Sequence, residues 1–226
     1  MINNYVKHGI LTSPINKKYN KTHLARLIVI CILKQVYSIS DINSLITLAL
    51  DSGARRGEIS ALRWGDLNFE ARTLKIDNSL KVINGVVDEK KAKTNSSNRV
   101  IILSEATIEV MKEYKKWQDD YIVKMGSKWK GTDRIFTADN GEHMNPSTCY
   151  KVFTKITKKN GLEHIRFHDI RHTSASILIS EGVSLKAVSE RLGHSSINIT
   201  SDIYTHTFES DRIKSANAFD KIIKNT

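Results

Sequence analysis

Apolar residues recur at helical spacing over several stretches of the chain, which predicts amphipathic helices. The first stretch begins at the capping residues Ser40 and Asp41 and ends before Gly53. A short second helix is predicted over 57–64. A longer helix begins after the cap Ser104, and the residues of its buried face are Ile108, Met111, Tyr114, Trp117 and Tyr121.

The period then changes to that of strands between residues 72 and 103. Four short segments rich in β-branched residues predict a small antiparallel meander: 72–76, 79–83, 86–90 and 99–103. Asn84-Gly85 lies between two apolar pairs, which is typical of a tight hairpin turn. The other turn, KAKTNSSN, is polar and basic.

The second half of the chain predicts a loop-rich region over 124–146, followed by more helices. These lie at about 147–160, 168–180 and 184–192, and they end at Gly161, Gly182 and Gly193. A short piece over 196–204 and an amphipathic segment over 209–223 close the chain. The predicted fold class is mainly α with a small antiparallel three-stranded β-sheet.

Charge and composition narrow the class of partner. The chain has 226 residues with 35 Lys and Arg against 24 Asp and Glu, a formal charge of +11. Such a balance favours a protein that binds a polyanion, above all nucleic acid, over a soluble protein whose basic charge has no function. No run of about 18 apolar residues occurs, so we expect no membrane span. Cys31 and Cys149 form no CxxC pair, which suits a cytoplasmic location.

The stretch RFHDIRHT, 166–173, carries the first candidate chemistry. His168 and Arg171 are three residues apart, a spacing that brings two side chains to one face of a helix. An imidazole transfers protons and a guanidinium binds anions, so the pair suits a reaction at a phosphate. One stretch does not decide this.

Two further stretches add cations. In SGARRGEISALRW, 52–64, Arg55 lies at a helix entrance, where it could grip a phosphate while Glu58 holds it. The alternative is an ordinary surface ion pair. In KAKTNSSNRVIIL, 91–103, Lys93 lies in a polar turn that suits DNA, although an exposed turn lysine is usually only solvated.

The last stretch, RLGHSSINITSDIYTH, 191–206, contributes His194 after a helix end and Tyr204 ten residues later. A single tyrosine on such a piece is by itself typical of a core or an interface. The remaining histidines that suggest zinc, His143, His164 and His206, lack HExxH-like spacing, so no metal is expected.

Taken together, these motifs occur in an order that resembles the tyrosine recombinase, or phage integrase, family. The matching motifs are GARRGE, KTNSSNR, HDIRHT, LGH and IYTH. The resemblance covers roughly residues 40–210, which correspond to the family's catalytic domain. It implies the DNA breaking-rejoining fold and site-specific recombination, in integration or excision of a phage or other mobile element.

The resemblance also implies a role for each residue. Tyr204 would be the nucleophile that forms a 3′-phosphotyrosine, and His168 would exchange a proton with it. Arg55 and Arg171 would bind the non-bridging phosphate oxygens. Lys93 would protonate the departing 5′-oxygen.

The other implied roles concern support and assembly. His194 would donate a hydrogen bond to a phosphate oxygen, with Glu58 and Asp169 as supports. No cofactor or metal is implied. The partner is double-stranded DNA, with a tetramer on DNA, a monomer in its absence, and accessory DNA-bending proteins as further partners.

Complete integrases of this type usually carry a core-binding domain before the catalytic domain. We therefore expect residues 1–22 to be a linker or remnant of such a domain, and residues 23–226 to be the catalytic domain. Its end, 209–226, would pack on a neighbouring protomer.

Two other functions stay open. A type IB topoisomerase shares this chemistry but relaxes supercoiled DNA without a site requirement. A basic DNA-binding protein without catalysis would use the helices over 168–194 as a reader.

Overall fold

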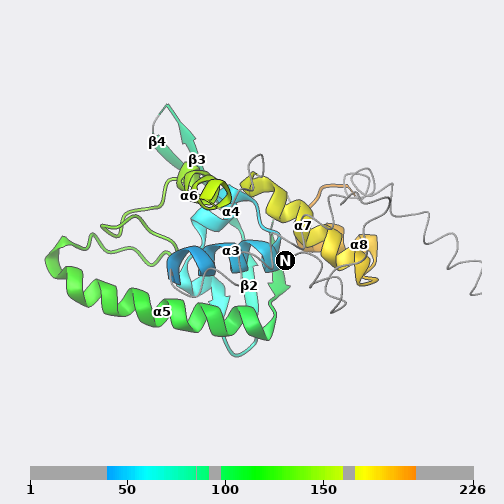
Figure 1. The fold of residues 1–226 in the computed structure, drawn as a ribbon, viewed down its shortest axis with the longest axis horizontal. Coiled ribbons are helices and arrows are strands. Elements are labelled where there is room, and N and C mark those ends of the chain that lie inside the picture. Colours follow the sequence, from blue (N-terminus) through cyan, green and yellow to red (C-terminus); the bar gives the residue numbers. More distant parts are fainter. Residues whose placement is uncertain (1–39, 85, 92–97, 160–165, 197–226) are drawn as a thin grey trace, which may run out of the picture.

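Six α-helices and five short strands make up the described part of the chain (Figure 1). The computed structural model describes residues 40–84, 86–91, 98–159 and 166–196. The helices are α3 (Ser40–Ser52), α4 (Arg56–Ala61), α5 (Glu105–Met125), α6 (Pro146–Lys159), α7 (Phe167–Ser180) and α8 (Leu185–Leu192). Short 3-10 helices follow α4 at Trp64–Asp66 and α5 at Gly126–Lys128. None of the described helices is both long and apolar enough to cross a membrane.

The helices confirm the predicted mainly α fold, with one boundary that differs. The helix expected over 57–64 begins at Arg56 and ends at Ala61, because Leu62 adopts extended angles (φ −58°, ψ 139°). Ser104 and Ser184 cap α5 and α8 by accepting hydrogen bonds from the backbone of the first turn.

The strands pair differently from the single meander that the sequence predicts. They are β1 (Leu67–Asn68), β2 (Thr73–Ile76), β3 (Asn78–Ile83), β4 (Val86–Lys91) and β5 (Arg99–Ile102). A three-stranded antiparallel sheet has the order β1-β2-β5, and β3 and β4 form a separate hairpin. The prediction missed β1, which has only two residues.

The register explains this difference. Asn78 pairs with Lys91, and Ile76 pairs with Arg99, so β2 and β3 follow one another along a single line with only Asp77 between them. Pairing along this line stops at Lys91 and resumes at Arg99. The basic turn is therefore not a link between meander neighbours, because β5 pairs with β2 rather than with β4.

The core lies where α3 meets α5 and α7, and it includes the buried side chains of the three-stranded sheet (Figure 1). Leu48 of α3, Met111 of α5 and Leu74 of β2 are completely buried. Burying each such side chain stabilises the fold by about 1.5–3 kcal/mol relative to leaving it exposed. This core fixes α3, whose C-terminal turn borders the candidate site.

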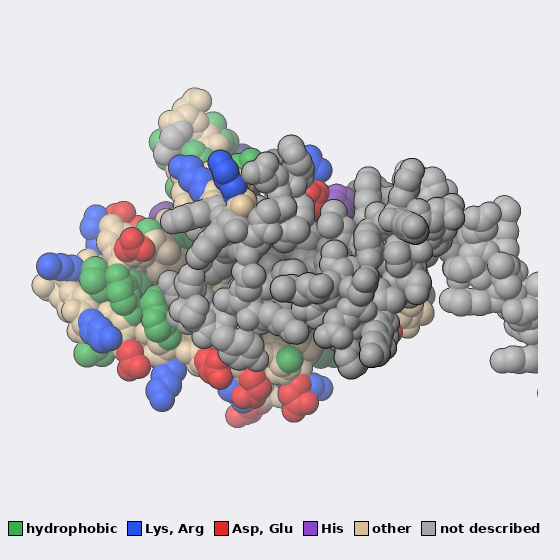
Figure 2. Space-filling view, in the orientation of Figure 1, with side chains coloured by type: hydrophobic (Ala, Val, Ile, Leu, Met, Phe, Trp, Pro, Cys, Tyr) green, Lys and Arg blue, Asp and Glu red, His purple; other side chains and the backbone are tan. Residues whose placement is uncertain are grey.

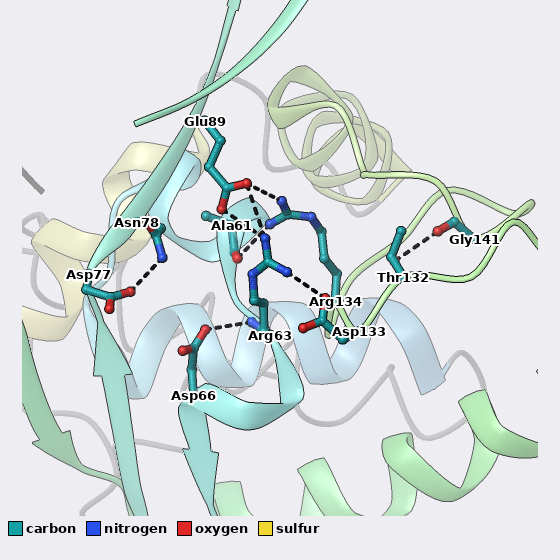
Figure 3. Close-up of polar contacts among 10 residues, drawn as sticks. All are labelled: Ala61, Arg63, Asp66, Asp77, Asn78, Glu89, Thr132, Asp133, Arg134 and Gly141. Carbon is teal, nitrogen blue, oxygen red and sulfur yellow. Dashed lines mark hydrogen bonds and ion pairs between the residues drawn. The ribbon is translucent and has the colours of Figure 1, made fainter. Parts of the chain in front are cut away.

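The base of the β3–β4 hairpin is held by an ion-pair cluster (Figure 3). Glu89 of β4 accepts hydrogen bonds from Arg134 Nη2 at 2.7 Å and Arg63 Nη2 at 3.3 Å. Arg134, only 3% exposed, also donates to the Ala61 carbonyl at 2.7 Å. The cluster ties the hairpin to the end of α4 and gives it a fixed direction.

The hairpin also lies directly against the start of α4. A Cβ atom added at Gly57 would fall 2.5 Å from the Leu80 carbonyl oxygen and 2.6 Å from Ser79 Oγ. Only glycine therefore allows β3 to approach α4 this closely. This packing explains Gly57, the second glycine of the GARRGE motif.

Gly57→Ala is expected to lower the free energy of unfolding by about 1–3 kcal/mol, because the added methyl group meets backbone that cannot move independently. Urea unfolding measures this change. The matched control is Gly65→Ala, where an added Cβ meets nothing within 4 Å, and the expected change is within about 0.5 kcal/mol. Equal stability of the two variants would contradict the packing argument.

Candidate active site

Arg55 is the N-cap residue of α4, and its side chain is anchored on two sides. The Glu58 carboxylate accepts the Arg55 backbone N–H at 2.7 Å and Arg55 Nη1 at 2.9 Å. Arg55 Nη2 donates to the Gly193 carbonyl at 2.9 Å. The predicted support by Glu58 is confirmed. The Arg55 side chain is still 41% exposed, so it can also meet a ligand.

Arg171 lies on α7 and is buried, with 4% exposure. Its Nη1 donates to the Gly53 carbonyl at 2.7 Å. Gly53 has φ +60°, and a Cβ there would fall 2.4 Å from Leu192 Cδ2. The turn after α3 thus receives Arg171 from α7 and Leu192 from α8, which brings three helices to one point.

His168 lies in the first turn of α7 and is exposed. Its ring meets the ring of His172 edge to face, with centroids 4.9 Å apart. Partial loss of hydration lowers the pKa of His168 below its ordinary value, and the charges of His172 and Arg171 lower it further. A neutral imidazole can accept a proton, which is what a general base requires.

His194 follows α8 through a left-handed turn at Gly193 (φ 68°, ψ 47°), and its N–H donates to the Ser189 carbonyl at 3.0 Å. Partial burial lowers the pKa of His194 from its usual 6.5 to about 4, helped by the charges of Arg171 and Arg55. His194 is therefore neutral near pH 7. A neutral imidazole beside two guanidiniums can donate one hydrogen bond without adding repulsion.

Of the six predicted site residues, four lie in the described part of the chain and converge. They come from α4, α7 and the end of α8 and are Arg55, His168, Arg171 and His194. Lys93 and Tyr204 lie outside the described residues, as do the segments 1–22 and 209–226. Their roles stay predictions.

Asp169 acts as a support at the start of α7, and two arginines of the site network were missed. Asp169 accepts the Arg166 backbone N–H at 2.8 Å and pairs with Arg166 Nη2 at 3.1 Å, so it holds the start of α7. Arg99 and Arg191, which the sequence analysis did not single out, join the site network. Arg99 ends the KTNSSNR motif and Arg191 directly precedes the LGH motif, and these positions are the signal that could have found them.

A metal site was not expected from the sequence. Within the described ranges, no three His, Cys, Asp or Glu side chains lie close enough together to hold a metal ion. His164 and His206 lie outside those ranges. The groups that the described site offers to a ligand are guanidiniums and imidazoles.

A groove of about 840 Å³ opens beside the site, between α4, β3 and the starts of α6 and α7. Its charged lining residues are Arg55, Arg56, Lys81 and Arg166, together with His168, and no described acidic side chain lines it. Along the lower edge of the view in Figure 2, by contrast, Asp and Glu side chains alternate with Lys and Arg side chains. The groove therefore suits a phosphate-rich ligand.

Comparison with known proteins decides the family. The phage integrase family matches residues 23–211. The chain belongs to this family. Its curated relatives include the "Tyrosine recombinase XerC-like" protein of Caldanaerobacter subterraneus subsp. tengcongensis, 34% identical over 186 residues, which cover 76% of this chain and 47% of that protein. The ICEBs1 integrase of Bacillus subtilis is 25% identical over 181 residues, 78% of this chain and 48% of the relative. This integrase-family chain thus spans about half the length of the curated relatives it matches.

Solved structures show the same fold. The Tn1549 transposon integrase in complex with transposon right end DNA has a TM-score of 0.71 and 24% identity, covering 89% of this chain and 67% of that one. XerA recombinase has a TM-score of 0.64 and 15% identity, covering 89% and 66%. The family and the fold that the motifs predicted are confirmed for this integrase-family chain.

The histidine environment gives a testable pH dependence. His194 should titrate with a midpoint near 4 in the folded protein, against 6.5 ordinarily. Between these values the unfolded chain binds a proton that the folded chain does not, so this group makes stability fall as pH drops from about 6.5 toward 4. NMR titration of the ring resonance, assigned by its loss in His194→Gln, measures the midpoint.

The control for this titration is Lys112→Gln on the exposed face of α5, which should leave the midpoint unchanged. Arg55→Gln should raise the pKa of His194, because it removes one of the positive charges that depress it. A His194 midpoint at or above its ordinary value in the unmodified chain would contradict the described environment.

Proposed function

We propose that this chain cleaves and rejoins DNA strands in site-specific recombination, for the integration or excision of a mobile element. The observation that carries the proposal is the convergence of Arg55 and Arg171, from different helices, beside two imidazoles of lowered pKa. Family membership and the similarity to recombinases support it.

In the proposed reaction, Tyr204 Oη attacks a DNA phosphorus and passes its proton to His168. The bond from phosphorus to the 5′-oxygen breaks, and Lys93 supplies the proton that this oxygen takes. A 3′-phosphotyrosine and a 5′-hydroxyl result. Attack by a 5′-hydroxyl on the phosphotyrosine reverses these steps and joins the strand to a new partner, so no external energy source is needed.

The guanidiniums act on the charge of the transition state. The negative charge that the non-bridging oxygens gain in the transition state requires fixed donors, and Arg55 and Arg171 are held by carbonyl or carboxylate partners in advance. We therefore also propose that cleavage needs no metal ion, because two arginines supply the charge that many phosphoryl-transfer enzymes obtain from magnesium. His194 adds a neutral hydrogen bond to the same phosphate.

The assembly follows from the proposed chemistry. Recombination exchanges strands between two duplexes, so four protomers on DNA would supply one active site per strand. In this proposal residues 209–226 pack on a neighbouring protomer, the free chain is monomeric, and the protein works in the cytoplasm with accessory DNA-bending proteins. In the same proposal residues 1–22 are a linker or remnant of a core-binding domain.

Covalent cleavage is tested with nicked duplexes taken from both ends of the DNA element that encodes the chain, with EDTA present. A nick lets the cleaved strand fragment diffuse away and traps the intermediate. We expect a labelled protein–DNA band that survives SDS, and its loss in Tyr204→Phe and in Arg171→Ala. Binding of the same duplexes is measured by fluorescence anisotropy.

Binding without any adduct would overturn the enzymatic proposal and favour a DNA-binding protein. An adduct that appears only when magnesium replaces EDTA would overturn metal independence. Sustained relaxation of supercoiled plasmid without a site requirement would favour a topoisomerase over a recombinase.

The groove is tested by removing two of its exposed cations together, in Arg56→Gln with Lys81→Gln. Each phosphate contact contributes about 0.9 to the slope of log affinity against log salt, so the slope should fall by about 1–2. The control pair is Lys112→Gln with Lys116→Gln on α5, at the opposite edge of the molecule from the hairpin (Figure 1). An equal loss in both pairs would mean that overall charge, not the groove, binds the DNA.

A further inference from the structure

A buried arginine outside the predicted catalytic set lies at the junction of the site. Arg99 begins β5, and its side chain is only 7% exposed. Its Nη1 and Nη2 donate to the two Glu58 carboxylate oxygens at 3.3 Å and 2.9 Å. Its Nε donates to the Arg191 carbonyl at 2.7 Å. One guanidinium thus contacts both α4 and the end of α8.

The contact with Glu58 controls Arg55. The same carboxylate holds the Arg55 backbone and its Nη1, so Glu58 is shared between two guanidiniums. Burial raises the pKa of Glu58, but the hydrogen bond and charge of Arg99, followed by those of Arg55, bring it below its usual value. Glu58 therefore stays ionised. Without the Arg99 fork, the whole carboxylate would be available to draw Arg55 away from a bound phosphate.

A second arginine, Arg191 of α8, donates hydrogen bonds in the opposite direction, from α8 to β5 and α3. Arg191 Nη1 donates to the Ile102 carbonyl of β5 at 2.9 Å, and its Nη2 donates to Asp51 Oδ1 at 2.7 Å. Two residues further on, the Gly193 carbonyl accepts Arg55 Nη2 at 2.9 Å. The end of α8, and with it His194, is therefore cross-tied to β5 and α3.

We propose that Arg99 is a positioning residue for phosphoryl transfer, which acts through Glu58 on Arg55. This inference rests on the proposed function, because it concerns the same phosphate. Arg99 does not touch DNA in this proposal, since its side chain is buried and engaged. Its loss slows cleavage because Arg55 no longer meets the transition state in its held orientation.

Arg99→Lys keeps the charge but loses the planar fork that matches a carboxylate. We expect the rate of adduct formation at saturating DNA to fall by about 10- to 100-fold, because small misplacements of a catalytic group have effects of this order. Affinity for DNA should stay within about threefold. Glu58→Gln should produce a similar loss, and the double variant should be no slower than the slower single variant, because both act on one network.

The control is Gln118→Ala on α5. Gln118 is 3% exposed, accepts a hydrogen bond from Trp64 Nε1 at 2.6 Å and donates to the Ile135 carbonyl at 2.9 Å, and α5 carries none of the predicted site residues. Gln118→Ala should lower the thermal unfolding midpoint about as much as Arg99→Lys and leave the adduct rate unchanged. An equal rate loss in the two variants would overturn the inference, because general destabilisation would then explain both.

A second substrate tests whether the rate loss of Arg99→Lys acts through Arg55 or through Lys93. Lys93 precedes Arg99 by six residues. In a duplex with sulfur in place of the bridging 5′-oxygen, attack by Tyr204 breaks the phosphorus–sulfur bond, and the thiolate leaves without needing a proton. If Arg99 acts through Arg55, the Arg99→Lys variant still forms the adduct slowly on this substrate, while the Lys93→Ala variant regains its rate of adduct formation. Recovery of Arg99→Lys together with Lys93→Ala would overturn the route through Arg55.

The wild-type chain separates this inference from the proposed function. If the wild-type chain forms no adduct on either substrate, the proposed function fails and the inference fails with it. If the wild-type chain forms the adduct and Arg99→Lys does so at the same rate, only the inference is overturned.

Discussion

A single buried carboxylate, Glu58, allows positive charge to accumulate at one place in this molecule. Arg55 and Arg99 both donate hydrogen bonds to it. The charges of Arg171, Arg55 and Arg99 all lower the pKa of His194. Cations gathered in a partly dehydrated site repel one another unless an anion lies between them. Glu58 supplies that anion inside the protein, while part of the Arg55 side chain stays exposed.

The same charge explains the state of the histidines. His168 and His194 have lowered pKa values because each is partly dehydrated and lies near guanidiniums. At neutral pH the two imidazoles are uncharged, so one can accept a proton and the other can donate a hydrogen bond. The network around Glu58 therefore sets both the position of Arg55 and the protonation of its neighbours.

Close backbone approach is the second condition for the site. Gly57 lets the β3–β4 hairpin lie against α4, and Gly53 lets α7 and α8 meet at the end of α3. The ion pairs around Glu89 hold the hairpin from its other side. These contacts place the basic wall of the groove next to Arg55 and His168.

The sequence by itself determined the family, the mainly α fold and the candidate residues, because short motifs in a fixed order and helical periodicity are local properties of the chain. Caps such as Ser104 and the turn glycine Gly193 also follow from local preferences. Only the tertiary structure decided that β5 pairs with β2, since register depends on the partner strand and not on the segment itself. It also decided that Arg99 and Arg191 belong to the site network. Both contacts join residues far apart in the sequence, and a buried hydrogen bond exists only once the fold has brought its donor and acceptor together.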